Sequence, residues 1–312
     1  MRILFCGTPR FAVPTLKHLL AQPDFNVLGV ITQPDRPRGR GQAVSSSPVK
    51  EAALEAKLPI HQPDKIRASE VQELLQGYAS ECIVIVAYGQ IIPARLLSIP
   101  KHGWINLHAS LLPRYRGAAP INWAIVNGET RTGVTTMRID AGMDTGGILL
   151  QRELEIGAKE TAPELAVRMS EAGAPLMAET LRALAAGSIV PRPQNHAQAT
   201  HAPLLGRADG RIDWGRTSEE IFNRMRGFAP WPGTYTTFRG QSCHIWGEPA
   251  SKEMKDHRPG TLLFEKDGLD VACGGATVLR VLSVKLEGRK QVSALEFANG
   301  ARVKEGERFG NT

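Results

Sequence analysis

Short apolar segments alternate with segments of helical periodicity over the first half of the chain. Four apolar runs, at residues 2–6, 26–32, 82–87 and 103–108, have the length and residue types of strands. The third is apolar throughout, which is typical of a strand that is buried on both faces. Between these runs, apolar residues recur at helical spacing. Strands that alternate with helices predict an α/β fold with a doubly wound, mostly parallel sheet.

A second pattern follows at residues 132–139 and 147–156, where two β-rich runs flank a polar turn that contains glycine. This arrangement predicts a hairpin-like pair of strands. Thr161 and Glu164 then form the S/T-x-x-E signature of a helix N-terminus. This helix can run to the end of the first predicted domain, residues 1–187.

Residues 188–206 contain three prolines and mostly polar side chains, with little apolar periodicity. Such a composition is typical of a linker. The second predicted domain, residues 207–312, has another helix-start signature at Thr217 and Glu220. Alternating segments punctuated by glycine and proline follow, and they predict a small β-barrel.

The composition is that of an ordinary water-soluble globular protein. Of the 312 residues, 42% are hydrophobic and 22% are charged, and no apolar run is long enough to cross a bilayer. The chain enters a strand directly after Met1, which leaves no room for a secretory signal. A cytoplasmic location is therefore expected. The net charge of +7 favours a polyanionic partner.

Several kinds of chemistry are disfavoured. Gly7 follows the first strand, but the later glycines of a dinucleotide-binding fingerprint are missing. The four cysteines are far apart and include no C-x-x-C pair, and the sequence has no H-E-x-x-H motif. We therefore expect reduced core thiols, no nicotinamide site and no metal.

Asn106 and His108 stand two residues apart where the fourth strand ends. On an extended chain they point to the same side, at the carboxyl edge where open α/β sheets form ligand crevices. An amide and an imidazole can together donate to a developing oxyanion, as acyl transfer requires. Taken singly, His108 could instead be a structural histidine.

A carboxylate in the later polar turn is the candidate third member of this site. Asp144 is favoured, because a carboxylate beside an imidazole stabilises the charged ring and orients it. Asp140 is the competing candidate, and Asp144 could instead cap the turn.

These residues lie within a longer pattern: Asn106-x-His108, Ser110-Leu111-Leu112-Pro113, Gly117 and Asp144-x-Gly146. The pattern resembles the folate-dependent formyltransferase family. The resemblance implies a Rossmann-like formyltransferase domain, a C-terminal OB-like barrel that binds tRNA, and 10-formyltetrahydrofolate as co-substrate. It also implies that Asn106, His108 and Asp144 are the catalytic set.

Five further segments resemble the branch of this family that formylates methionyl-tRNA; they are residues 33–41, 47–50, 86–90, 116–121 and 212–214. With them the match spans nearly the whole chain. It implies transfer of a formyl group to the free amino group of methionyl-initiator tRNA, for translation initiation.

Two groups of residues are expected to bind the substrates. Ser110, Leu111, Leu112 and Pro113 are expected to shape the folate slot, because the proline stiffens the loop and the leucines supply an apolar wall. A purely structural role is the alternative. The basic loop that is expected to hold the tRNA acceptor end carries Arg36, Arg38 and Arg40, with Lys50 beyond. A solvated surface segment is the alternative reading of this loop.

The second domain is expected to add phosphate contacts from Arg224 and Arg226, and a monomer is expected. Two rival functions remain open from the residues alone. One is a formyltransferase for a small amine, such as glycinamide ribonucleotide or an amino sugar nucleotide. The other is an RNA-binding module that carries out no chemistry.

Overall fold

A computed structural model of the protein describes residues 1–38, 43–265, 268–304 and 306–310. The chain forms two compact units. The N-terminal unit comprises Met1–Pro120, Arg131–Glu155 and Leu165–Pro203. The C-terminal unit comprises Ile121–Thr130, Ile156–Glu164 and Leu204–Thr312.

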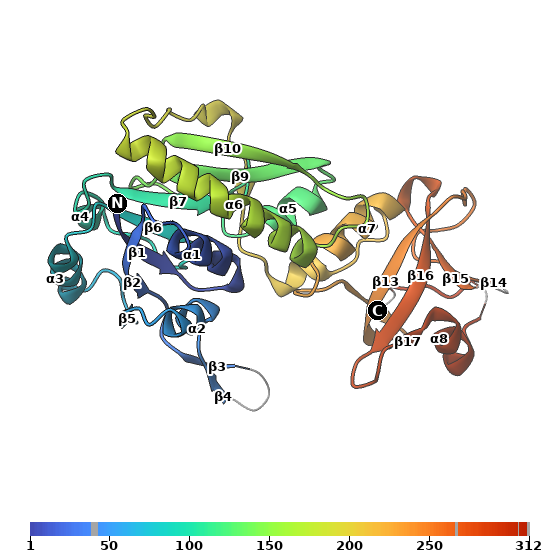
Figure 1. The fold of residues 1–312 in the computed structure, drawn as a ribbon. Coiled ribbons are helices and arrows are strands. Elements are labelled where there is room, and N and C mark those ends of the chain that lie inside the picture. The colour runs from blue at the N-terminus through green and yellow to red at the C-terminus, as the bar shows by residue number, and fades with distance from the viewer. Residues whose placement is uncertain (39–42, 266–267, 305, 311–312) are drawn as a thin grey trace. The chain divides into compact units, whose positions relative to one another are not determined.

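The N-terminal unit is built on a seven-stranded sheet with the order β10-β9-β7-β6-β1-β2-β5 (Figure 1). Its strands are β1 (Arg2–Gly7), β2 (Asn26–Ile31), β5 (Ile60–His61), β6 (Cys82–Val86), β7 (Trp104–His108), β9 (Arg131–Arg138) and β10 (Ile148–Glu155). The pairs from β7 to β5 are parallel, whereas β9 is antiparallel to both β7 and β10. The four predicted strands and the predicted hairpin are confirmed.

Helices cover both faces of this sheet, so the doubly wound prediction is confirmed. The helices of the unit are η1 (Arg10–Ala12), α1 (Val13–Leu20), α2 (Pro48–Glu55), α3 (Ser69–Tyr78), α4 (Ala94–Leu97), η2 (His196–Gln198) and most of α6 (Ala162–Ala185). Leu75 of α3 and Leu96 of α4 share a core cluster with Trp104. On the other face of β7, a Cβ at Gly173 of α6 would lie 2.5 Å from Leu107, so glycine allows the helix to approach the sheet closely.

Strand β7 is anchored by its first residue. The Trp104 side chain is fully buried, and its Nε1 donates to the Leu96 carbonyl oxygen (2.9 Å). Alternate residues of a strand share a face, so Asn106 and His108 lie on the same face as Trp104. The buried indole thus fixes the strand that carries both candidate side chains.

The C-terminal unit is an antiparallel sheet with helices packed on it. The sheet order is β12-β13-β16-β15-β14, with β17 paired to β16. The elements are α5 (Pro120–Val126), η3 (Arg207–Gly210), α7 (Ser218–Gly227), β12 (Tyr235–Phe238), β13 (Gln241–Ala250), β14 (Leu262–Glu265), β15 (Gly268–Ala272), η4 (Gly274–Ala276), β16 (Val278–Leu286), β17 (Val292–Ser293) and α8 (Ala294–Ala301). The capping box that was predicted at Thr217 and Glu220 opens α7.

The segment predicted as a linker is packed as far as Pro203. Strand β11 (His201–Ala202) pairs in parallel with β8 (Arg116–Gly117), and Arg192 bridges to Ile148. These contacts place residues 192–202 within the N-terminal unit; we call them the strap. The domain boundaries proposed from the sequence stay a prediction.

Within the described part of the chain, no helix is long and apolar enough to cross a membrane. All four cysteines are free and buried, as predicted. Burial raises the pKa of the Cys243 and Cys273 thiols to about 12. Protonated thiols of this kind are poor nucleophiles.

Candidate active site

Two polar side chains lie at the carboxyl end of β7, an interior strand of the sheet. Asn106 is half-buried, and His108 is 6% exposed. Asn106 lies between Ile85 of β6 and Met137 of β9 in the sheet register. The amide and the imidazole therefore share one face, as the sequence predicts.

The imidazole of His108 is held from both sides. Nε2 lies 3.0 Å from the carbonyl oxygen of Tyr115, and because a carbonyl can only accept, Nε2 carries a hydrogen. Nδ1 lies 3.6 Å from Oδ2 of Asp144. A ring that is protonated at both nitrogens would place each N–H group against an oxygen acceptor.

The turn between β9 and β10 separates the two candidate carboxylates. Asp140 Oδ1 accepts hydrogen bonds from the Gly142 amide (3.0 Å) and the Thr145 hydroxyl (2.6 Å), so it organises the turn itself. Asp144 Oδ2 accepts from the Gly117 amide (2.9 Å) and faces His108. Of the two carboxylates that the sequence left open, the structure brings Asp144 to the histidine.

Two buried residues that were not predicted from the sequence support this turn. Gln194, which lies in the strap, donates from Nε2 to the carbonyl oxygens of Asp144 (2.8 Å) and Gly146 (2.7 Å). Its Oε1 accepts from the Arg116 guanidinium. Sequence spacing gives no signal for these contacts, because the acceptors are backbone groups about 50 residues away.

The loop that follows His108 is packed against β9. Ser110 is fully buried, and its hydroxyl donates to the Arg114 carbonyl oxygen (2.6 Å). Leu112 is buried beside Met137 and Ile148. Leu111 and Pro113 keep partial exposure. The loop therefore holds two of its predicted folate contacts in the interior and leaves the other two accessible.

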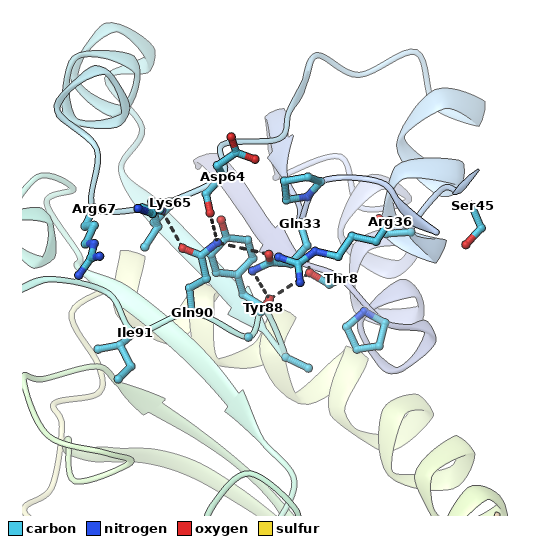
Figure 2. Close-up of a pocket in the computed structure, with 16 residues that line it drawn as sticks. Thr8, Gln33, Arg36, Ser45, Asp64, Lys65, Arg67, Tyr88, Gln90 and Ile91 are labelled. Atoms are coloured by element: carbon cyan, nitrogen blue, oxygen red, sulfur yellow. Dashed lines mark hydrogen bonds between the residues drawn. The ribbon is translucent and has the colours of Figure 1, made fainter. Parts of the chain in front are cut away.

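A pocket of about 920 Å³ opens at the carboxyl ends of β1, β2, β5 and β6. Figure 2 shows Gln33 and Gln90 hydrogen-bonded in its middle, with the Arg36 guanidinium reaching toward them (Gln90 Nε2 to Gln33 Oε1, 3.3 Å). Lys65 and Arg67 add two more basic side chains to the lining. Strand order reverses on either side of β1, which makes this edge a topological switch point where ligands bind in such folds.

Two protein-family models together match most of the chain. Residues 1–181 match the family described as formyl transferase, and residues 205–302 match the one described as formyl transferase, C-terminal domain. The chain belongs to the formyl transferase family. The predicted membership is thereby confirmed.

Individual relatives are similar in sequence over nearly the full length of the chain. A protein named methionyl-tRNA formyltransferase from Solibacter usitatus is 52% identical over 310 residues, which is 99% of each chain. One of the same name from Geobacter metallireducens is 47% identical over 312 residues, covering 100% of this chain and 99% of the other.

Solved structures with lower sequence identity share the fold. WlaRD, a sugar 3N-formyl transferase solved in the presence of dTDP and 5-N-formyl-THF, has a TM-score of 0.65 at 18% identity, covering 93% of this chain and 99% of its own. HypX from Aquifex aeolicus in complex with tetrahydrofolic acid has a TM-score of 0.60 at 15% identity, covering all of this chain and 51% of its own.

In this formyl transferase, the predicted basic loop includes two short paired strands, β3 (Arg36–Arg38) and β4 (Ala43–Ser45). Arg36 is exposed and lines the pocket, whereas Arg40 lies outside the described residues. Lys50 forms an ion pair with Asp35, which also accepts from Gln62 Nε2 (2.8 Å). Lys50 thus closes the base of the loop in this structure.

These bonds lower the pKa of the Asp35 carboxyl, with Lys50 as the larger cause and Gln62 as the second. A carboxyl whose pKa is lowered by folding contributes stability above its unfolded pKa and loses it as the pH falls through the folded one. We expect Lys50→Met to raise the pKa of Asp35 toward its ordinary value in an NMR titration. Lys57→Met, at an exposed lysine, is the matched control. An unchanged titration of Asp35 in Lys50→Met would show that the ion pair does not lower the pKa of Asp35.

Arg226 is not placed to contact phosphate, contrary to the sequence expectation. It is 4% exposed, and its Nη1 donates to the carbonyl oxygens of Gly157 and Glu160 (both 3.2 Å). Arg224 donates to the Asp209 carbonyl oxygen (3.2 Å) and lies over the Phe228 ring. Arg226 is thus buried inside the C-terminal unit and Arg224 is half-buried, which periodicity alone did not reveal.

No group of three or more His, Cys, Asp or Glu side chains among the described residues is arranged to hold a metal ion.

Proposed function

We propose that this protein transfers a formyl group from 10-formyltetrahydrofolate to the amino group of methionyl-initiator tRNA. The observation that carries the proposal is the site at the end of β7, where Asn106 and His108 share a face and Asp144 lies 3.6 Å from the imidazole. Support for the acceptor comes from a relative named methionyl-tRNA formyltransferase that matches at 52% identity over nearly the whole chain.

The donor is a substrate of the reaction. WlaRD, a sugar 3N-formyl transferase, was solved in the presence of 5-N-formyl-THF, and HypX was solved in complex with tetrahydrofolic acid; both have the same fold as this chain, and a formylated folate is the donor that we propose here. Leu111 and Pro113 are the partly exposed members of the predicted folate slot. Ser110 and Leu112 would act through the shape of the loop, because both are buried.

Transfer begins when the neutral amine attacks the formyl carbon. A C–N bond forms to the incoming nitrogen, and the carbonyl electrons move onto the formyl oxygen. The Asn106 amide donates to that oxygen, where negative charge develops, and His108 Nε2 donates as well once this oxygen replaces the Tyr115 carbonyl oxygen as its acceptor. The electron pair then returns, and the bond from the formyl carbon to the donor nitrogen breaks.

One proton must leave the amine and reach the departing nitrogen. His108 can carry it, since an imidazole beside a carboxylate can give up and regain a proton at the reacting centre. Asp144 holds the ring in place and balances its charge. No covalent bond to the protein is needed.

The acceptor end of the tRNA is proposed to enter the pocket of Figure 2. Strand β6 lies between β1 and β7 in the sheet, and neighbouring strands are about 4.8 Å apart. The pocket is therefore adjacent to the strand that carries His108. Its basic lining by Arg36, Lys65 and Arg67 suits phosphates, and the folate slot lies on the other side, against β9.

Replacing Arg36 and Arg67 together by alanine is expected to raise the KM for methionyl-tRNA with little change in kcat. Binding to phosphates releases counterions, so the slope of log KM against log salt should fall by about 0.7–0.9 for each phosphate that the protein no longer neutralises. Steady-state kinetics at several salt concentrations measure this. Arg131→Ala, at an exposed arginine of β9, is the matched control; equal effects of both variants would refute a tRNA role for the pocket.

The proposed function is tested with the purified protein and 10-formyltetrahydrofolate. Charged initiator tRNA, charged elongator methionine tRNA and glycinamide ribonucleotide are offered as acceptors. Formylation of the initiator tRNA alone is the expected result. Transfer only to the small amine would keep the chemistry and overturn the acceptor, and transfer to none of the three would leave the RNA-binding alternative.

A further inference from the structure

Three consecutive residues hold the parts of the candidate site together. The Tyr115 carbonyl oxygen contacts His108 Nε2, the Arg116 guanidinium contacts Gln194, and the Gly117 amide donates to Asp144 Oδ2. The strap secures these residues in turn. The Thr200 carbonyl oxygen accepts from the Arg116 amide (2.8 Å), and the Thr200 hydroxyl accepts from the Tyr115 amide (2.8 Å).

We propose that Gln194 is a positioning residue that sets Asp144 against His108, with Arg116 fixing its orientation. The inference rests on the proposed function, and it assigns to the strap a role in the catalytic site. Gln194 itself would touch neither substrate.

Every hydrogen-bonding group of the Gln194 amide is used. Nε2 has two hydrogens, and they meet the carbonyl oxygens of Asp144 (2.8 Å) and Gly146 (2.7 Å). Oε1 accepts from Arg116 Nε (3.0 Å) and Nη2 (2.6 Å). Because a guanidinium can only donate and a carbonyl can only accept, the amide has a single orientation in this network. Gln194 is 6% exposed, so water does not compete strongly for these bonds.

The network supports two residues whose backbone conformation is unfavourable. Asp144 has φ 52° and Tyr115 has φ 59°, both in the left-handed region that side chains other than glycine rarely adopt. Both residues contact the imidazole of His108. Each is tied to the strap by a hydrogen bond, Asp144 through Gln194 and Tyr115 through Thr200. Unusual backbone persists only where the surroundings enforce it, and it gathers at functional sites.

The two halves of the amide can be tested separately. Gln194→Glu keeps the size of the side chain and offers Arg116 a carboxylate, but it has no hydrogen for the carbonyl oxygens of Asp144 and Gly146. We expect this variant to stay folded and to lose both hydrogen bonds to the turn. Gln198→Glu, at an exposed glutamine of the same strap, is the matched control.

The kinetic test is a double-mutant cycle on the full chain with methionyl-tRNA as acceptor. Gln194→Glu is expected to lower kcat by about 10²-fold, the scale of a catalytic group displaced by an ångström, with KM for both substrates within about twofold. In the Asp144→Ala background the same substitution should have no further effect, because it acts through Asp144. Wild-type kcat in Gln194→Glu, or an equal reduction in both backgrounds, would overturn the proposal.

A spectroscopic readout keeps the inference independent of the acceptor. The ¹⁵N chemical shifts of the His108 ring report its contact with Asp144 whether or not turnover is seen. Gln194→Glu should move them toward their values in Asp144→Ala, while Gln198→Glu leaves them unchanged. If the wild-type protein formylates none of the acceptors, the proposed function fails and these shifts still decide the role of Gln194. Unmoved shifts in Gln194→Glu would refute it.

Discussion

Replacing His108 by alanine is expected to lower kcat for formyl transfer by about 10²- to 10⁴-fold, the range that a positioned acid–base group contributes. The ring has two tasks in the proposed mechanism, since it donates to the developing oxyanion and carries the amine proton. The Michaelis constants should change little, because the ring contributes mainly after the substrates are bound. Single-turnover formylation of methionyl-tRNA isolates the chemical step.

Asn106, the other proposed oxyanion donor on β7, provides a comparison for this result. Asn106→Ala removes one oxyanion donor and should cost about 10²- to 10³-fold in kcat. His18→Ala, in α1, changes the same residue type in the same unit away from the site and should leave the rate unchanged. Near-normal turnover in His108→Ala, with the fold intact by circular dichroism, would exclude the imidazole from the chemistry.

Removal of the indole that anchors β7 is expected to have the largest effect on stability. Trp104→Ala should lower the free energy of unfolding by about 3–5 kcal/mol, the range for a large buried aromatic. Stabilities of domains are about 5–15 kcal/mol, so much of the margin would disappear. The cause is the cavity beneath the sheet, together with the Leu96 carbonyl oxygen that loses its donor.

Urea unfolding followed by far-UV circular dichroism measures this change without depending on tryptophan fluorescence. Trp104→Phe separates the two causes, because it keeps most of the volume and removes the N–H group. An unpartnered buried acceptor costs about 1–3 kcal/mol, so this variant should fall between the wild type and Trp104→Ala. A decrease below about 1 kcal/mol in Trp104→Ala, well under the cost of such a cavity, would mean that the indole does not anchor the strand.

Much of the framework could be predicted from the sequence because its signals are local. The five residues of β6 are all apolar, which predicts a central strand, and the structure buries all five. That Asn106 and His108 share a face follows from strand geometry. The helix start at Thr217 has a three-residue signature that the structure confirms. Each of these features depends on neighbours within a few positions of the chain.

The support of the site could not be predicted, because its contacts are distant and involve backbone groups. Gln194 meets carbonyl oxygens at Asp144 and Gly146, and any residue type supplies a carbonyl. The polar, proline-containing composition of residues 188–206 is equally typical of a free linker. Likewise, Asp140 and Asp144 have the same side chain in one turn, and only the three-dimensional path of the chain shows which of them meets the histidine.

The late position of the strap has a consequence for the order in which a ribosome makes the protein. When synthesis has passed the end of α6, every proposed catalytic side chain has been made, but Gln194 and Thr200 have not. A nascent chain of that length could form most of the parallel sheet and would still lack the clamp on the Asp144 turn. Full formyl-transfer activity would then arise only once the chain as far as Pro203 has left the exit tunnel. A protein designer who wishes to isolate the catalytic unit should place the cut beyond the strap.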